Sequence, residues 1–546
     1  MKNNNYIFSK NLINEYIKIG VKYAFVSPGS RNTPLLLALC DQKKIKVLSI
    51  IDERVSGFMA LGAAKSLKFP VLVVTTSGSA VANLFPSIVE SFMSSVPIIY
   101  ITADRPKKLI NTGSNQTIYQ EKIFGKYVLN FFDVSIENHI KNTQSIKLAK
   151  ESLSISLNKK GPVHINIHFD KPLYVKNRLN LIHNKPTDNF IPKTEKNNII
   201  SSFPNFSIFK KPLIVCTDDK DIIIIKKLEK YKIPIFMECI GSRFTLKSKN
   251  IISNYEFILK NKSINPDLII RFGKKPISNA LNSFLKENRN KIYLVSEKIF
   301  NDDSKNIINL SNEQFFNEFC KQKFNFDIKW FSEISIYQNI IEKKILKYFS
   351  DPIEHEGYIL NRIISKIPDS SNIFIGNSSP IRDLDQFTFN ISKKFNIYSN
   401  RGASGIDGLI SSSIGIALTS NDNNFTIIGD MSFYYDVSSL INNSLVKNLT
   451  IIVINNMGGH IFDRLEGIST ESQYIKYWLN PINYKIRDIA KSFNCDYIKL
   501  KYNNLNDLDF LNESFKGIRI VEVIIESKNH HLENDKICKG IKKELI

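Results

Sequence analysis

The stretch from residue 426 to residue 463 constrains the fold and the chemistry of this chain more than any other. An apolar run at 426–428 stops at Gly429-Asp430, and a β-branched run at 450–454 stops before Asn456 and a glycine pair. In open α/β sheets, ligands bind where polar groups follow the carboxyl ends of the strands. A carboxylate and an amide oxygen suit Mg²⁺, and glycines let the backbone approach a diphosphate closely. The stretch therefore predicts a metal–diphosphate site, although Gly-Asp and Asn-Asn are also common in ordinary turns.

The residues between these two runs have the spacing of a helix. Val437, Leu440, Ile441 and Leu445 recur on one face of a 3.6-residue period, so a strand–helix–strand unit is expected. Gly-Asp followed at this distance by Asn-Asn resembles the diphosphate motif of thiamine diphosphate (ThDP) enzymes, in which a glycine usually follows the aspartate. Met431 occupies that position here. A contact made only through the backbone would tolerate the change.

Length, charge and cysteine usage exclude several classes of protein. At 546 residues the chain is long enough for about three domains of ~150 residues. The net charge of +22 is spread along the chain without a compact basic cluster, so we expect no nucleic-acid partner but some attraction for anionic substrates. No apolar stretch reaches the ~18 residues of a membrane span, and no signal core is present. The six scattered cysteines indicate reduced thiols and a cytoplasmic location.

Strand-like and helix-like segments alternate through the first part of the chain. Strands are expected at 23–26, 47–51, 71–75, 97–102 and 163–167, and helices at 7–20, 33–40, 57–66, 80–91 and 141–158. Alternation with polar residues after each strand is typical of a doubly wound parallel sheet.

The alternation stops at 171–212, where Asn, Lys and Pro predict a linker. A second α/β unit, with strands at 213–216, 233–237, 268–272 and 292–295, ends near residue 345. A third unit has strands at 373–376 and 397–399 before the stretch at 426–463. The fold prediction is therefore α/β, with three doubly wound parallel-sheet domains at 1–180, 181–345 (linker included) and 346–546.

Charged residues also follow several expected strands. Glu53 lies after one of them, where pairing with a neighbouring arginine would be the ordinary interpretation. In a ThDP enzyme, a carboxylate here would bind the pyrimidine ring and favour its reactive imino tautomer. Four arginines at strand ends favour a pocket for anions, because guanidinium binds carboxylate bidentately. They are Arg31, Arg105, Arg382 and Arg401.

Several motifs in order carry a closer resemblance. They are VSPGSRNTPL (26–35), DERVSGFMALG (52–62), TTSGSAVANLFP (75–86), TADRP (102–106), GSNQTIYQ (113–120), GNSSPIRDLD (376–385), NRGASGIDGL (400–409), GDMSFYYD (429–436) and NNMGGHIF (455–462). Together they resemble the MenD family, the ThDP-dependent 2-succinyl-5-enolpyruvyl-6-hydroxy-3-cyclohexene-1-carboxylate (SEPHCHC) synthases of menaquinone biosynthesis. The resemblance implies a pyrimidine-binding, a central and a diphosphate-binding domain, in that order. It also implies a dimer or tetramer whose active sites are shared between subunits.

The resemblance assigns roles to individual residues. The metal, Mg²⁺ or Mn²⁺, would be held by Asp430, Asn456 and the carbonyl of Gly458, and Glu53 would activate the cofactor. ThDP would contact Ser77, Gly78, Ile406, Gly429, Met431, Ser432, Gly459 and Ile461. Substrates would contact Ser30, Arg31, Arg105, Asn115, Gln116, Ser378, Arg382, Arg401, Phe462 and Leu465. One departure is Asn279, where the family usually has a lysine, so that Lys274 or Lys275 is a candidate for the missing charge.

The activity implied is decarboxylation of 2-oxoglutarate on ThDP, followed by 1,4-addition of the succinyl group to isochorismate. The products would be CO2 and SEPHCHC, which retains the pyruvate-derived side chain. The alternative enzyme is another ThDP-dependent lyase or ligase of 2-oxo acids, such as an acetolactate synthase relative. A binding protein that kept the fold without catalysis is a third possibility, which the presence of Glu53, Asp430 and Asn456 disfavours.

Overall fold

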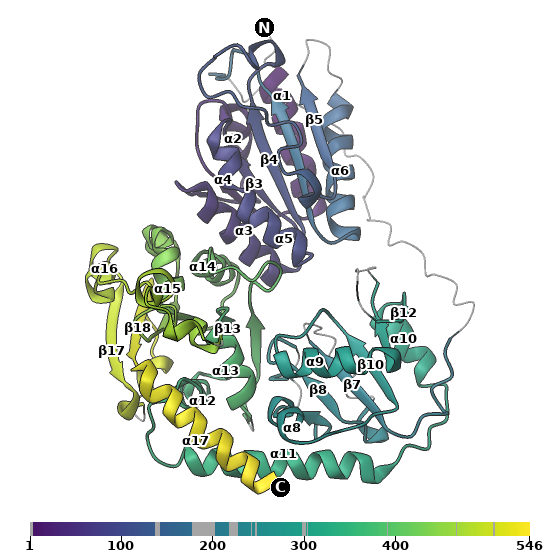
Figure 1. The fold of residues 1–546 in the computed structure, drawn as a ribbon. Helices are drawn as coiled ribbons and strands as arrows, with labels where there is room; N and C mark the ends of the chain where they lie inside the picture. The colour runs from purple at the N-terminus through teal and green to yellow at the C-terminus, as the bar shows by residue number, and fades with distance from the viewer. Residues whose placement is uncertain are drawn as a thin grey trace.

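Three six-stranded sheets, all with parallel pairing, make up the molecule (Figure 1). The computed structural model describes residues 4–136, 142–176, 203–217, 228–297 and 302–545, except 242, 246–247, 303, 390, 466 and 506–507. Most of the expected linker at 171–212 lies outside these residues. The predicted α/β class with three doubly wound sheets is confirmed.

The first sheet has the strand order β2-β1-β3-β4-β6-β5. Its strands are β1 (Tyr23–Val26), β2 (Lys46–Ser49), β3 (Val71–Thr75), β4 (Ile98–Asp104), β5 (Phe131–Ser135) and β6 (Pro162–His168). Its helices are α1 (Asn4–Ile19), α2 (Thr33–Cys40), α3 (Glu53–Leu67), α4 (Ser79–Asn83), α5 (Phe85–Met93) and α6 (Asn142–Asn158). Sequence reasoning missed β5, and the single helix expected at 80–91 is two helices that meet before a proline, which starts helices readily.

The second sheet has the order β12-β11-β10-β7-β8-β9. Its strands are β7 (Pro212–Cys216), β8 (Ile235–Met237), β9 (Ile251–Ile252), β10 (Leu268–Phe272), β11 (Ile292–Val295) and β12 (Asn306–Ile308). The helices here are α8 (Tyr255–Asn261), α9 (Asn279–Glu287), α10 (Asn312–Phe319) and the long α11 (Ile328–Tyr348), which leads into the third unit. The two short strands β9 and β12 were not expected.

The third sheet repeats the strand arrangement of the first, in the order β14-β13-β15-β16-β18-β17. Its strands are β13 (Ser371–Ile375), β14 (Phe395–Tyr398), β15 (Asn424–Gly429), β16 (Leu449–Asn455), β17 (Asp496–Lys501) and β18 (Ile518–Ile524). Its helices are α12 (Glu356–Lys366), α13 (Ser379–Phe387), α14 (Leu409–Thr419), α15 (Asp430–Tyr435), α16 (Ile486–Ser492) and α17 (Ser527–Leu545).

The helix expected between Asp430 and the next strand is wrong in detail. The chain forms the short α15 and then a 3-10 helix at Val437–Leu445. Leu440 is buried, but Ile441 is 54% exposed, so the expected apolar stripe does not form as a whole. A 3-10 helix has three residues per turn, which moves side chains spaced for an α-helix off a common face.

Helices α3 and α14 join the first and third units (Figure 1). Their backbones approach so closely that a Cβ atom on Gly62 would lie 1.8 Å from the Ser412 carbonyl oxygen, and one on Gly415 would lie 2.0 Å from that of Met59. Lys65 of α3 also donates to the Ser399 carbonyl and to Asn400. At the start of α3, Ser438 of the third unit donates to Asp52 at 3.1 Å, so the segment that carries Glu53 is also held against that unit.

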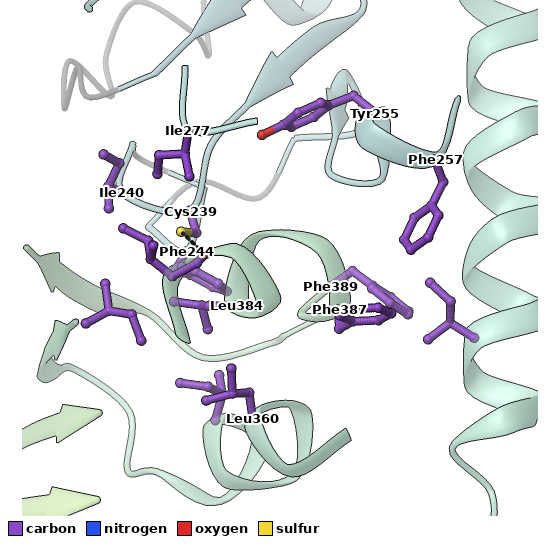
Figure 2. Packing of buried hydrophobic residues seen from close by; sticks show 14 of the residues in the cluster. Cys239, Ile240, Phe244, Tyr255, Phe257, Ile277, Leu360, Leu384, Phe387 and Phe389 are labelled. Carbon is purple, nitrogen blue, oxygen red and sulfur yellow. Dashed lines mark hydrogen bonds between the residues drawn. The ribbon is translucent and has the colours of Figure 1, made fainter. Parts of the chain in front are cut away.

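The second and third units share one hydrophobic core. Figure 2 shows Tyr255 and Phe257 from the second unit opposite Leu384 and Phe387 from the end of α13. At the same interface, the buried Asp385 carboxylate accepts from the Cys239 backbone N–H at 2.7 Å and pairs with Arg243 at 3.2 Å. These contacts fix α13, whose first turn follows β13 at the candidate site.

Candidate functional site

The main candidate site is a cavity of about 320 Å³ at the carboxyl ends of β13, β15 and β16. In the third sheet, β13 is followed by β14 on one side and β15 on the other, so the gap between β13 and β15 is a topological switch point, where ligands of open sheets bind. Many residues named from the sequence line this cavity. They are Ser378, Ile406, Gly429, Asp430, Met431, Ser432, Asn456, Gly458, Gly459, Ile461 and Phe462.

Asp430 is the first residue of α15 and is 4% exposed. Its carboxylate accepts from the Met431 backbone N–H at 2.8 Å, and the Gly458 backbone also donates to it. Burial raises the pKa of Asp430 to about 7, despite these hydrogen bonds. A buried carboxylate that is costly to ionise in isolation gains stability from a bound cation.

Asn456 contributes an amide oxygen that has no protein partner. The Oδ1 atom is buried without a hydrogen bond among the residues described, whereas Nδ2 donates to Glu356 Oε1 at 2.9 Å. Beside it, Gly458 has φ +142°, and a Cβ atom there would come within 2.6 Å of the Leu479 carbonyl oxygen. The loop after β16 therefore needs glycine at position 458, and Asn456 and Gly458 both line the cavity.

These groups fit a hard divalent cation bound with a diphosphate. One carboxylate, one unpartnered amide oxygen and nearby main chain are oxygen donors of the type that Mg²⁺ prefers, with room left for phosphate oxygens. Among the residues that the structure describes, no group of three or more His, Cys, Asp or Glu could hold a metal by side chains alone. A softer metal such as zinc therefore has no obvious ligand set in the described residues.

Several residues of the cavity were missed by sequence reasoning. Glu356 and Asn377 contribute polar groups, and Tyr477 and Trp478 line it from a π-helical turn at Ile475–Leu479. Only Asn377 has a sequence signal, since it follows β13 in the GNSSPIRDLD stretch. Glu356 starts α12 in a stretch with no recognisable motif, and an isolated π-turn has no pattern that sequence reasoning can detect.

A second cavity, of about 510 Å³, adjoins the first and shares Ile461 with it. Its lining residues include Lys260, Arg382, Arg464, Glu256, Asp383, Ser278, Asn279 and Leu465. Arg382 donates to the Ser378 carbonyl at 2.7 Å, and its pKa is lowered by burial and by the nearby Arg464 and Arg401. Neighbouring guanidinium groups repel one another, so an anionic ligand between them is favoured.

The second cavity also locates Asn279, where the family usually has a lysine. Lys274, one candidate for the missing charge, lies elsewhere: its Nζ donates to the Met93 carbonyl, and it lines a different cavity. Lys275 lines neither the first nor the second cavity. Lys260 is the lysine that shares the cavity with Asn279, and its Nζ lies 2.7 Å from Glu256 Oε1.

A separate cluster lies at the switch point of the first sheet, where β1 and β3 are neighbours. Arg105 donates to Ser77 Oγ at 2.6 Å and to Gln116 Oε1 at 3.4 Å. Arg31 donates to the Phe169 carbonyl at 2.8 Å, and its pKa is lowered by burial and by Arg105. Gly78 packs against Gln116, whereas Ser30 and Asn115 are exposed. None of these residues lines the cavity around Asp430 in the same chain.

Glu53 is the first residue of α3 and is partly exposed. Its neighbour Asp52 caps the helix by accepting from the N–H groups of Arg54 and Val55. No partner for the Glu53 carboxylate occurs among the described residues, and it does not line the Asp430 cavity. The helix therefore does not need Glu53 for capping, which leaves its carboxylate available for a ligand.

Arg401 is close enough to Arg382 to lower the pKa of that guanidinium, but it lines a different cavity. It lines a third cavity, of about 470 Å³, with Lys65 and Lys274 at the junction of the three units. Its Nη1 donates to Asn377 Oδ1 at 3.1 Å, which links it to a residue of the Asp430 cavity.

Comparisons with known proteins agree with this architecture. Residues 9–123 match the family model for the N-terminal TPP-binding domain of thiamine pyrophosphate enzymes. The chain is 30% identical to the SEPHCHC synthase of Listeria welshimeri, over 97% of each chain. It is 32% identical to the synthase of Flavobacterium johnsoniae, over 96% of each chain, and 29% identical to that of Lysinibacillus sphaericus, over 98% of this chain and 97% of the relative.

Proposed function

The chain belongs to the SEPHCHC synthase family, and we propose that it catalyses the ThDP-dependent transfer of a succinyl group from 2-oxoglutarate to isochorismate, a step of menaquinone biosynthesis. It is then a transferase that forms a carbon–carbon bond and releases CO2. The alternative of an acetolactate synthase relative is not favoured, because the relatives named above are all SEPHCHC synthases.

The cavity around Asp430 is the proposed cofactor site. Asp430, Asn456 and the Gly458 carbonyl would hold Mg²⁺ or Mn²⁺, and the glycine-rich loop would accept the diphosphate. When bound, ThDP supplies the electron sink that lets 2-oxoglutarate lose CO2 and its succinyl carbon add to isochorismate. The chain's own residues would bind the cofactor and the substrates, orient them and exclude water from the site.

The cationic groups would position the two anionic substrates. Ser378 lines the cofactor cavity, and Arg382 lines the adjoining one with Arg464 and Lys260, which are paired there with Asp383 and Glu256. Arg31, Arg105 and Gln116 form the second set, in the first unit. Bidentate guanidinium–carboxylate pairs would hold the acceptor and donor in a fixed relative orientation, which lowers the entropic part of the barrier.

Glu53 and the arginines of the first unit do not line the Asp430 cavity of their own chain. We propose that they complete the cavity of a second subunit in a homodimer or tetramer.

The proposed boundaries at 1–180, 181–345 and 346–546 give each sheet its own domain. The six free cysteines support a reducing, cytoplasmic location. Among the described residues, no helix has the length and apolar character to cross a bilayer.

The observation that carries this proposal is one cavity lined by both the buried Asp430 and Asn456, whose Oδ1 has no partner among the described residues, beside a second cavity lined by Arg382. The experiment supplies ThDP, Mg²⁺, 2-oxoglutarate and isochorismate, and follows the loss of isochorismate. Consumption that requires all four components supports the proposal. Turnover of pyruvate, with no loss of isochorismate, would support the acetolactate synthase alternative instead.

A further inference from the structure

We propose that Glu356 is a positioning residue that fixes the amide of Asn456 with its oxygen toward the metal. This inference rests on the proposed function, since it concerns the cation of the same cofactor site. Glu356 lies outside the motif at 426–463 and comes from α12, on a separate part of the third unit.

The carboxylate of Glu356 is not needed by its own helix. The side chain of His355 accepts from the Tyr358 N–H at the start of α12, and the Glu356 N–H donates to His530 Nδ1 at 3.2 Å. The two histidines therefore satisfy two of the four N–H donors that a helix start leaves open, without the Glu356 carboxylate. Glu356 is only 4% exposed, and it lines the cofactor cavity.

The contact between Glu356 and Asn456 fixes which end of the amide faces the cavity. With Nδ2 donating to Oε1 at 2.9 Å, Oδ1 is left buried and without a partner among the described residues. Rotating the amide by half a turn would bring Oδ1 against a carboxylate and lose a charge-assisted hydrogen bond. This hydrogen bond therefore selects the amide orientation that offers an oxygen to a cation. Groups that hydrogen-bond to a metal ligand commonly orient the ligand in this way.

Two roles can be separated by chemistry at position 356. If Glu356 acts as an acceptor for Asn456, then glutamine serves nearly as well, because its Oε1 also accepts. Methionine has similar length but cannot accept, so Glu356→Met leaves the amide free to rotate. If Glu356 instead acted through its negative charge, glutamine would fail as badly as methionine.

The test is a Mg²⁺ titration of the full protein in saturating ThDP, followed by tryptophan fluorescence. Trp478 lines the cavity, and the chain has one other tryptophan, Trp330, which is replaced by phenylalanine in all variants. The expected result is a 10- to 100-fold weaker Mg²⁺ affinity for Glu356→Met and less than about a threefold change for Glu356→Gln. At saturating Mg²⁺, Glu356→Met should recover most of the wild-type kcat, which a merely misfolded variant would not.

The matched control is Glu354→Met. Its carboxylate accepts from the Glu526 backbone and Asn529, away from the cavity lining. This variant should titrate like the parent. Unchanged Mg²⁺ affinity in Glu356→Met, or an equal loss in Glu356→Gln, would overturn the inference. Absence of any Mg²⁺-dependent signal in the parent would overturn the proposed cofactor function and this inference with it.

Discussion

The carbonyl oxygen of Ser412 lies where only a glycine at position 62 can face it, since a Cβ atom there would come within 1.8 Å. The obstructing atom is backbone, so it cannot rotate away. Gly62→Ala should therefore push α3 from α14 and destabilise the protein by about 1–3 kcal/mol, although alanine favours helices. A lower melting temperature checks this. An unchanged or raised value would mean that the two helices are not in this contact in solution.

Glu53→Gln should abolish turnover, because the proposed role of Glu53 is that of a carboxylate that favours the imino tautomer of ThDP. The binding of ThDP should change little, because Asp52 and not Glu53 caps α3. Binding is measured by titration and turnover by isochorismate loss. Turnover at the wild-type rate would contradict the role given to Glu53.

Mixing two inactive variants tests whether subunits share the site. Glu53→Gln and Asp430→Asn damage different halves of the proposed site, and Glu53 does not line the Asp430 cavity of its own chain. Co-folded mixed dimers should contain one intact site and restore about a quarter of the wild-type activity at equal mixing. Mixtures as inactive as their parents would show that each site is built from one chain.

Lys260 should matter for isochorismate, because it is the lysine that lines the chamber containing Asn279 and Arg382. Lys260→Met should raise the KM for isochorismate roughly tenfold, the equivalent of a charge-assisted contact of about 1.4 kcal/mol. Adding Asn279→Lys to this variant should lower the KM again. Lys262→Met, whose amine lies over the Tyr337 ring, is the control. Equal KM values for wild type and Lys260→Met would remove Lys260 from substrate binding.

Asp436 gives the protein a predictable dependence of stability on pH. It is fully buried, and burial raises its pKa to about 6, even though Ser411 donates to it. Because the folded pKa exceeds the unfolded value, its contribution is complete below about pH 4 and is lost as pH rises through about 6, a change of about 3 kcal/mol. The stability of wild type relative to Asp436→Asn should therefore fall between pH 4 and pH 7. A difference that does not vary with pH would contradict this.

The sequence predicted most of the strands, because apolar runs followed by turn residues are typical of buried parallel strands, but it missed β5, β9, β12, β17 and β18. The positions of Asp430 and Asn456 at adjacent strand ends followed from that pattern. It could not predict the 3-10 helix at Val437–Leu445, since hydrophobic spacing does not distinguish it from an α-helix over so short a length. The sequence also could not predict the role of Glu356, because that role depends on a contact with a residue 100 positions away.

The central claim is that the succinyl group of 2-oxoglutarate becomes bonded to isochorismate on this protein. The most direct measurement is mass spectrometry of the product formed from uniformly ¹³C-labelled 2-oxoglutarate and unlabelled isochorismate, with ThDP and Mg²⁺. The account predicts one adduct that carries four labelled carbons, C2 to C5 of 2-oxoglutarate, while the C1 carboxyl carbon next to the keto group is released as labelled CO2. Labelled CO2 without a labelled adduct, or no consumption of either substrate, would contradict it.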